Sequence, residues 1–212
     1  FRSVLGHEFC GEVVEVGNEV HHVRVGDRVA VDNNIRCGFC DFCRMGLTSQ
    51  CVDIKTSALG VMRDGGYAEY CIVPEKQCFV LPDEIDDILG TQVETLATVV
   101  NGMNTLLMLP YDYVMIIGFG PIGYLFAQFA RNIAAKVAVT EIDPYRISVA
   151  KQCGLTVWNP TEEDVVKNIT DFTYGRKADI VIEATGNGLE QALQCVTPGG
   201  KVLPFGMDSS IT

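Results

Sequence analysis

The chain has 212 residues, of which 48% are hydrophobic and 20% are charged, a balance typical of a globular protein with a substantial core. Its formal net charge of -11 argues against nucleic acid, or any other polyanion, as the main partner. No apolar run approaches the length that spans a bilayer, and the first residues lack the architecture of a signal peptide, so we expect no membrane partner.

Short valine-rich segments separated by glycine and aspartate turns make up residues 1–85. Clear examples are Gly11–Gly17, Val25–Val31 and Tyr67–Val73, each of which predicts a strand. Such punctuation is typical of a small barrel or sandwich. The acidic run Asp83–Asp87 ends this part and predicts the start of a helix, because acidic side chains favour the first turn.

Four cysteines interrupt this part with the spacing C-x2-C-x2-C-x7-C, namely Cys37, Cys40, Cys43 and Cys51. Two-residue gaps let neighbouring sulfurs turn back onto one ion, so the four thiolates predict a tetrahedral zinc site. Four sulfurs leave no position for a substrate, which indicates a structural metal. Scattered free or disulfide-bonded cysteines are the weaker alternative, because the spacing is specific and the nine cysteines suit a reducing cytoplasm.

Helical apolar spacing over residues 88–109 predicts a long helix, broken at Gly102 and ended by Pro110. The period then changes, and helices alternate with strands. The predicted strands lie at residues 114–117, 136–140, 179–182 and 201–205, with one helix at 124–132 and another opened by Pro144. This βαβαβ order predicts a parallel, doubly wound sheet. We place the boundary between the two domains after residue 87.

A glycine fingerprint, Gly118-Phe-Gly120-Pro-Ile-Gly123, lies between the first of these strands and its helix. Gly118 allows a tight turn, Gly120 lets a pyrophosphate approach the backbone, and Gly123 permits close packing of helix on sheet. With Pro121 and Ile122 they predict a dinucleotide-binding turn whose phosphates meet the helix N-terminus. A turn that serves packing alone is the weaker alternative, because strand, turn and helix stand in the required order.

A carboxylate, Glu141, follows the second predicted strand of this sheet. At that place it would accept hydrogen bonds from both hydroxyls of the adenosine ribose and would repel a 2′-phosphate. The sequence therefore favours NAD over NADP. Arg146 either lies against the adenine or is a solvated helix side chain, and the sequence leaves both interpretations open.

Several motifs occur in a recognisable order, namely Gly6-His7-Glu8, Val25–Val29, the four cysteines, Asp64–Tyr70, Glu94–Ala97 and the glycine fingerprint. This order resembles the zinc-dependent medium-chain dehydrogenases, especially the polyol (sorbitol-like) and threonine dehydrogenase branch. The resemblance implies an α/β plus β protein. It places a partial GroES-like catalytic domain at residues 1–87, with a structural zinc lobe at 37–51, and a partial Rossmann NAD-binding domain at 88–212. It also implies a cytoplasmic homo-oligomer, either a dimer or a tetramer.

The same resemblance implies roles for four further residues. His7 matches the histidine ligand of a catalytic zinc, and Glu8 matches the glutamate beside that metal. Glu94 matches the position that ligates zinc, directly or through water, in the polyol branch. Thr98 falls where the family contacts the nicotinamide. The implied reaction is hydride transfer from a secondary alcohol to NAD, with zinc as the Lewis acid.

Three features of the family have no counterpart here. The cysteine that is the first catalytic zinc ligand would precede Phe1, as would the serine or threonine that relays the proton. The family also continues past the position of Thr212. The resemblance therefore implies an internal fragment with a complete structural zinc site and an incomplete catalytic one, and we expect this fragment to lack native turnover.

Three hypotheses for the function follow. The first is a zinc- and NAD-dependent dehydrogenase, with sugar alcohols, sugar-alcohol phosphates, threonine and simple secondary alcohols all open as substrates. The second is a non-catalytic zinc- and nucleotide-binding sensor on the same scaffold, which one zinc per chain and NAD binding without turnover would indicate. The third, a zinc-ribbon interaction module, is disfavoured by the dinucleotide-binding pattern downstream.

Overall fold

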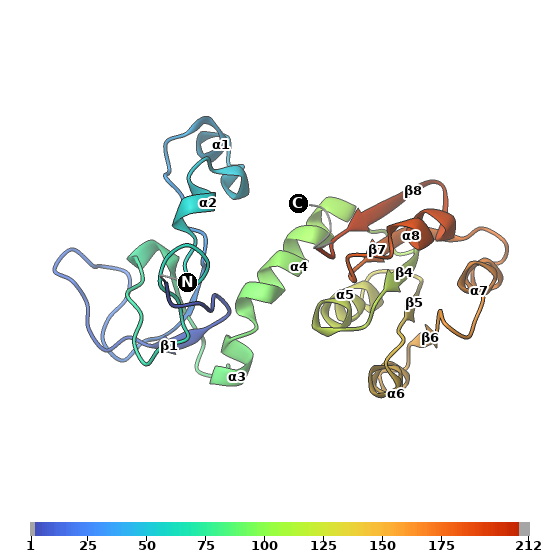
Figure 1. Cartoon of the computed structure of the whole chain (residues 1–212), viewed down its shortest axis with the longest axis horizontal. Coiled ribbons are helices and arrows are strands. Elements are labelled where there is room, and N and C mark those ends of the chain that lie inside the picture. Colours follow the sequence, from blue (N-terminus) through green and yellow to red (C-terminus); the bar gives the residue numbers. More distant parts are fainter. Residues whose placement is uncertain (1–2, 208–212) are drawn as a thin grey trace. The chain divides into compact units, whose positions relative to one another are not determined.

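The computed structural model describes residues 3–207 (Figure 1). The chain divides into two compact units, the first ending at Ala97 and the second beginning at Thr98. The sequence analysis had placed the change of domain after residue 87. No helix among the described residues is long and apolar enough to cross a membrane.

The first unit is built on a small antiparallel sheet, which has the order β1-β2-β3 among residues 3–207. Its strands are β1 (Cys10–Glu12), β2 (Arg28–Val31) and β3 (Cys78–Val80). The central strand β2 is paired on both edges and buries Val29, Ala30 and Val31. The predicted strands at 11–17 and 25–31 are therefore present as shorter pieces.

The strand predicted at Tyr67–Val73 is wrong, since the structure assigns no strand to that segment of the described chain. Its apolar side chains are strongly exposed, with 81% of Tyr67 and 96% of Ile72 accessible. The Tyr67 amide donates to the Leu5 carbonyl at 2.9 Å, outside any ladder. An alternating pattern becomes a strand only where a neighbouring strand completes the hydrogen bonds, and this segment has none in the described residues.

Short helical turns follow the strands of the first unit or lie in the segments between them. They are α1 (Asp41–Arg44), η1 (Thr48–Gln50), α2 (Ile54–Ser57), η2 (Glu75–Gln77) and α3 (Asp87–Gly90). The acidic run does start a helix, as predicted. The Asp86 carboxylate caps α3 by accepting the Leu89 amide at 2.8 Å.

The helix predicted at residues 88–109 is broken between Gly90 and Val93, and not at Gly102. After α3 the chain resumes as α4 (Val93–Leu106), which runs through Gly102 without a break. A Cβ at Gly102 would lie 3.0 Å from Phe126 Cζ and 3.2 Å from Leu203 Cδ2. The glycine is therefore kept for close packing, and this packing outweighs its low helix propensity, which costs about 1 kcal/mol.

The second unit is a parallel sheet with helices on both faces. In the described part of the chain its order is β6-β5-β4-β7-β8, and every pair of neighbours is parallel. The strands are β4 (Tyr113–Ile117), β5 (Lys136–Thr140), β6 (Thr156–Trp158), β7 (Ala178–Glu183) and β8 (Val196–Pro204). The helices that follow them are α5 (Pro121–Arg131), α6 (Pro144–Gln152), α7 (Val165–Phe172) and α8 (Leu189–Cys195). The predicted doubly wound sheet is confirmed, with β6 as a strand that the sequence analysis did not predict.

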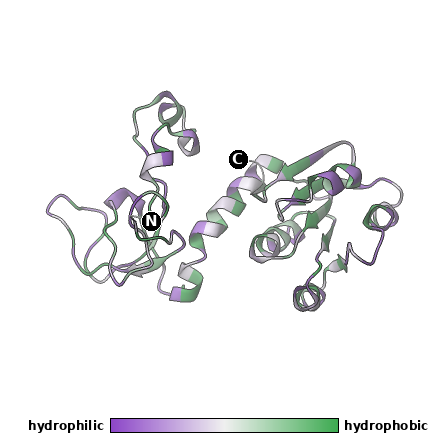
Figure 2. Cartoon of the chain, in the orientation of Figure 1, coloured by the Kyte–Doolittle hydropathy of each residue, from purple (hydrophilic) through white to green (hydrophobic). Residues whose placement is uncertain are grey.

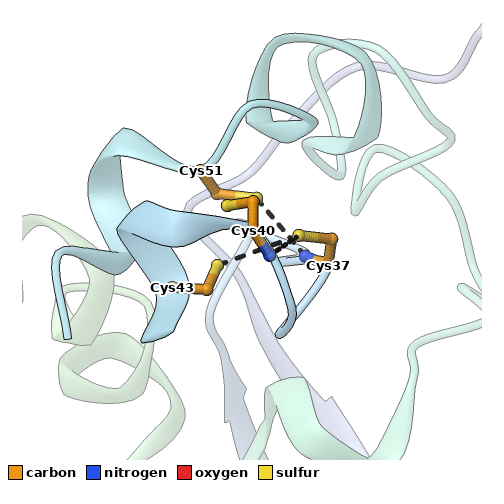
Figure 3. A group of neighbouring side chains, drawn as sticks. All are labelled: Cys37, Cys40, Cys43 and Cys51. Atoms are coloured by element: carbon orange, nitrogen blue, oxygen red, sulfur yellow. Dashed lines mark hydrogen bonds between the residues drawn. The ribbon is translucent and has the colours of Figure 1, made fainter. Parts of the chain in front are cut away.

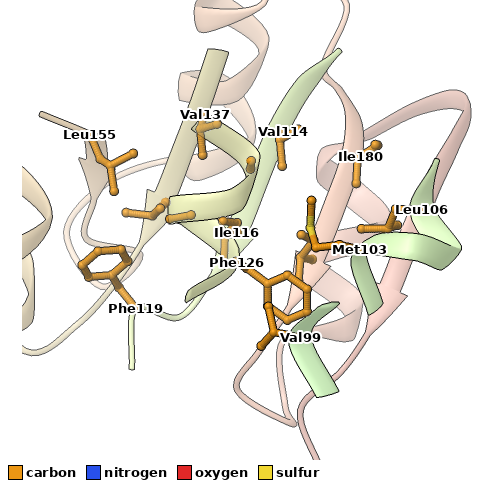
Figure 4. Close-up of a cluster of buried hydrophobic side chains, with 14 of the residues drawn as sticks. Val99, Met103, Leu106, Val114, Ile116, Phe119, Phe126, Val137, Leu155 and Ile180 are labelled. Carbon is orange, nitrogen blue, oxygen red and sulfur yellow. The ribbon is translucent and has the colours of Figure 1, made fainter. Parts of the chain in front are cut away.

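Side chains alternate across this sheet and form two hydrophobic clusters among the described residues. From β4, Val114 and Ile116 join the cluster that α4, α5 and α6 cover, whereas Met115 and Ile117 join the one that α7 and α8 cover. Figure 4 shows part of the first cluster, in which Val99 and Phe126 meet beside the sheet. Figure 2 shows the strands as mostly hydrophobic and the helices as mixed. Burial on both faces explains the continuous apolar run of β4.

We expect Phe126→Ala to lower the free energy of unfolding by about 3–5 kcal/mol. Phe126 is fully buried, and its ring meets Phe205 edge to face with 4.9 Å between centroids, so truncation leaves a cavity that the sheet cannot fill. Denaturant unfolding followed by circular dichroism measures the loss. Tyr145→Ala, at a side chain that is 76% exposed, is the control. A loss below about 1 kcal/mol in Phe126→Ala would contradict the packing described here.

Candidate metal centres and cofactor cleft

The four predicted cysteines come together in the lobe at 37–51 (Figure 3). The four sulfur atoms all lie within 4.8 Å of one another, and those of Cys37 and Cys43 are 4.0 Å apart. Sulfurs at about 2.3 Å from a tetrahedral zinc ion are roughly 3.8 Å from each other. The donor set and its spacing therefore fit zinc, and the enclosed arrangement fits a structural ion.

Backbone amides around the lobe point at these sulfurs. The Cys40 amide donates to Cys37 Sγ, and the Cys37 amide donates to Cys51 Sγ, each at 3.3 Å. Amide hydrogens aimed at sulfur stabilise thiolates, the form that binds metal. The local chain path, with α1 starting directly after Cys40, thus supplies charge stabilisation as well as geometry.

The thiols of the lobe differ in their pKa values. Hydrogen bonds from the Cys43 and Val52 amides lower the pKa of Cys40 to about 6. Desolvation, together with the neighbouring sulfurs, raises the pKa of Cys43 to about 12. A thiolate at one position in the cluster therefore disfavours ionisation of the neighbouring thiol. A divalent cation at the centre removes that repulsion, and its binding must release protons.

A second group of potential metal ligands consists of His7, Glu8 and Glu94, which the sequence analysis had assigned to a catalytic zinc. One donor atom of each lies within 4.8 Å of the others. Glu94 stands in the first turn of α4, and Glu8 is exposed. Burial raises the pKa of the Glu94 carboxyl; His7 opposes this shift, whereas Glu8 and Asp32 add to it. An imidazole with carboxylates suits zinc, and an exposed donor suits a centre that is open to ligands.

The second unit carries a cleft of about 700 Å³ at the carboxyl ends of β4, β5 and β7. The central strand β4 lies between β5 and β7. Helix α5, which follows β4, covers one face of the sheet, and helix α7, which precedes β7, covers the other. In doubly wound sheets such a switch point opens the ligand crevice. All but one of the predicted cofactor-binding residues line it, namely Gly118, Gly120, Pro121, Ile122, Gly123, Glu141 and Arg146. The exception, Thr98, lies in α4 and does not line this cleft.

The glycine turn has the geometry that close approach requires. Gly118 has a φ of 90°, and a Cβ there would lie 2.5 Å from Thr185 Cγ2. A Cβ at Gly123 would lie 2.0 Å from the Gly118 oxygen, so helix α5 packs directly on the turn. No side chain of the described residues caps the first turn of α5. Its amides therefore face the cleft as donors for an anion such as a diphosphate.

Glu141 is a buried carboxylate, 6% exposed, that the backbone holds in place. Its Oε2 accepts the Phe119 amide at 2.9 Å, and its Oε1 accepts the Ile142 and Asp143 amides at 2.7 and 2.9 Å. A carboxylate has about four acceptor sites, so capacity remains for a ligand hydroxyl. The guanidinium of Arg146 lies 3.8 Å from Oε2 at the rim of the cleft, half exposed.

Sequence analysis missed one whole wall of this cleft. The missed lining residues are Ile117, Thr140, Ile142, Pro160, Ala184, Thr185, Asn187, Gly188 and Gln191. Four of them, Ala184, Thr185, Asn187 and Gly188, belong to the turn between β7 and α8. The available signal was Ala184-Thr-Gly-Asn-Gly188 directly after a buried strand, which places a second glycine-rich turn at the same edge of the sheet.

Comparison with known proteins supports the two-part reading of the chain. Residues 1–83 match the family described as "Alcohol dehydrogenase GroES-like domain", and residues 121–211 match "Zinc-binding dehydrogenase". The chain belongs to the medium-chain dehydrogenase/reductase family, the zinc-binding dehydrogenases that combine these two domains.

Relatives and solved structures agree on this family. The chain is 40% identical over 211 residues to an L-threonine 3-dehydrogenase of Pyrococcus abyssi, a match to 97% of this chain and 59% of the relative. A zinc-binding dehydrogenase of Sinorhizobium meliloti, solved with NADP, superposes with a TM-score of 0.88 at 35% identity, over 96% of this chain and 62% of its own. Galactitol-1-phosphate dehydrogenase of Escherichia coli superposes with a TM-score of 0.86 at 29% identity, over 94% and 58%. The chain thus spans about 60% of the length of its relatives.

Proposed function

We propose that the protein containing this chain is a zinc-dependent oxidoreductase that transfers a hydride between a secondary alcohol and NAD. The observation that carries the proposal is that one chain holds both parts that this chemistry needs. These parts are the donor group His7, Glu8 and Glu94, and a dinucleotide cleft with a buried carboxylate, Glu141. The four-cysteine lobe is proposed to hold a second, structural zinc ion.

Each residue has a distinct task in this proposal. His7 and Glu94 hold the catalytic metal, with Glu8 beside it as an exposed carboxylate. When bound, zinc supplies the Lewis acidity that lowers the pKa of a substrate hydroxyl, and the nicotinamide accepts the hydride. The amides of the glycine turn orient the diphosphate, and Glu141 accepts a hydroxyl of the ribose. Thr98 is proposed to contact the nicotinamide.

The cofactor is proposed to be NAD. Glu141 supports this choice, because a buried carboxylate at the ribose disfavours a 2′-phosphate. The Sinorhizobium meliloti neighbour is bound to NADP, so both cofactors belong in the test. Among substrates we propose threonine-like alcohols, polyols and polyol phosphates, since the relatives and neighbours include threonine and galactitol-1-phosphate dehydrogenases. A dimer or tetramer in the cytoplasm completes the proposal.

Activity is tested with a panel of threonine, sorbitol, galactitol 1-phosphate and a simple secondary alcohol, with NADH formation as the readout. Because the chain spans about 60% of its relatives, the assay uses both this chain and the longest protein that contains it. We expect the longer protein to reduce NAD⁺ with at least one of these alcohols. One bound zinc ion per chain and NAD binding without turnover of any alcohol would support the sensor hypothesis instead.

We expect His7→Ala to lower kcat/KM by more than about 100-fold, since replacing a residue that merely supports a metal ligand already costs about 10–100-fold. His21→Ala is the matched control, because that side chain is exposed and lies outside both ligand groups. Metal analysis should find one zinc ion fewer per chain in His7→Ala and none lost in the control. Full activity of His7→Ala would remove His7 from the site.

A further inference from the structure

Glu183, the last residue of β7, is a buried carboxylate to which the proposed chemistry gives no task. Only 2% of it is exposed, and it stands among the largest fully buried side chains. Burying an acceptor-only group is costly unless donors surround it. The donors that surround Glu183 therefore indicate what the residue does.

Four donor groups from the turn that follows Glu183 reach its side chain. Oε1 accepts the amides of Thr185, Gly186 and Gly188 at 2.7, 2.9 and 3.3 Å, and the Thr185 hydroxyl as well. Oε2 shares the Gly186 amide at 3.1 Å. One carboxylate thus holds the whole turn between β7 and α8. Charge-assisted hydrogen bonds of this kind are roughly twice as strong as neutral ones.

The Thr185 hydroxyl connects Glu183 to Asn187. It donates to Glu183 Oε1, and its oxygen lies 2.8 Å from Asn187 Oδ1. The same oxygen accepts the backbone amide of Asn187 at 3.3 Å. One hydroxyl thus links the buried carboxylate to both the side chain and the backbone of Asn187.

The turn held by Glu183 is also the missed wall of the cleft. Thr185 and Asn187 are exposed and line it. The Thr185 methyl carbon fills the space beside Gly118, lying 2.5 Å from where a Cβ of that residue would stand. Glu183 thus acts on the cofactor cleft in two ways, through the Thr185 methyl against the glycine turn and through the Thr185 hydroxyl, which contacts Asn187.

We propose that Glu183 is a positioning residue for cofactor binding, which fixes Thr185 and, through the Thr185 hydroxyl, holds Asn187 in the wall of the cofactor cleft. This inference rests on the proposed binding of a nicotinamide dinucleotide. Glu183 is assigned no direct contact with the cofactor, because only 2% of the residue is exposed.

Three side-chain changes separate this role from simple support of the fold. The affinity for NADH is measured by fluorescence titration of the zinc-loaded protein. We expect Glu183→Gln to raise the Kd for NADH about tenfold, because charge-assisted hydrogen bonds are lost. Thr185→Val, which keeps the methyl against Gly118 but lacks the hydroxyl, should weaken binding similarly. Thr185→Ser, which keeps the hydroxyl, should retain most of the affinity.

Coupling with Asn187 is the decisive readout. If Glu183 acts through Asn187, the double variant Glu183→Gln/Asn187→Ala binds NADH no more weakly than the weaker single variant. Additive losses, or an unchanged Kd in Thr185→Val, would overturn the positioning role even if Glu183→Gln fails to fold. A parent protein that binds neither NADH nor NADPH would overturn the proposed function and this inference with it.

Discussion

Cys40→Ser is expected to remove one zinc ion per chain and to open the lobe at residues 37–51. The four sulfurs of this lobe lie within 4.8 Å of one another, and serine replaces a thiolate by a poor zinc ligand. Structural zinc contributes its binding free energy to folding, about 10–16 kcal/mol in small zinc peptides, so loss of the ion is a large effect. Three remaining sulfurs leave a weakened, open site.

Metal analysis and limited proteolysis measure this effect together. We expect the zinc content of Cys40→Ser to fall by one equivalent and protease cleavage to appear within the lobe. Cys71→Ser is the matched control, because that cysteine is outside both groups of metal ligands found in the described residues. Zinc binding should also weaken as the pH falls, since the thiols must lose protons to bind. Unchanged zinc content in Cys40→Ser would remove the lobe assignment.

The second large effect concerns the choice of cofactor, where we expect the parent protein to bind NAD at least about 100-fold more tightly than NADP. Two like charges 4 Å apart repel by about 4 kcal/mol at the dielectric constant typical of a protein surface, equivalent to well over a hundredfold. The Glu141 side chain is only 5% exposed, so salt screens it weakly. A 2′-phosphate at the ribose would meet this charge directly.

Glu141→Gln is expected to reduce the NAD/NADP affinity ratio by at least about tenfold, because the charge is removed while the shape remains. Part of the affinity for both cofactors should be lost as well, since the Phe119 amide loses its carboxylate acceptor. Titration of both cofactors against the parent and Glu141→Gln gives the ratio. Glu162→Gln, at an exposed acidic residue, is the control. Tighter binding of NADP than of NAD by the parent would refute the assignment of Glu141.

Local patterns made part of this structure predictable. The spacing of Cys37 to Cys51 constrains the sulfurs over a few residues, and the glycine turn follows from strand, turn and helix in direct succession. The parallel sheet could be predicted because β4 and β5 are buried on both faces and so form continuous apolar runs.

Features that depend on distant parts of the chain were not predictable in the same way. Tyr67–Val73 carries the pattern of a strand but lacks a strand to pair with among the described residues. Gly102 reads as a helix break, yet packing against Phe126 explains it. Glu183 looks like an ordinary strand end, and only the turn folded back over it shows how many donors it holds. For the first two features the deciding contact lies outside the local sequence, whereas the donors to Glu183 come from the next five residues but follow no pattern that the sequence alone reveals.

The most direct test of the proposed hydride transfer follows the hydrogen itself. An alcohol from the panel that supports turnover is prepared with deuterium on its carbinol carbon, and the NADH formed by the longest protein containing this chain is examined by NMR. We predict deuterium at C4 of the nicotinamide, on one face only, and loss of the product in His7→Ala. NADH formed without deuterium at C4, or no reduction of NAD⁺ by any alcohol in a protein that carries both zinc ions, would contradict the account.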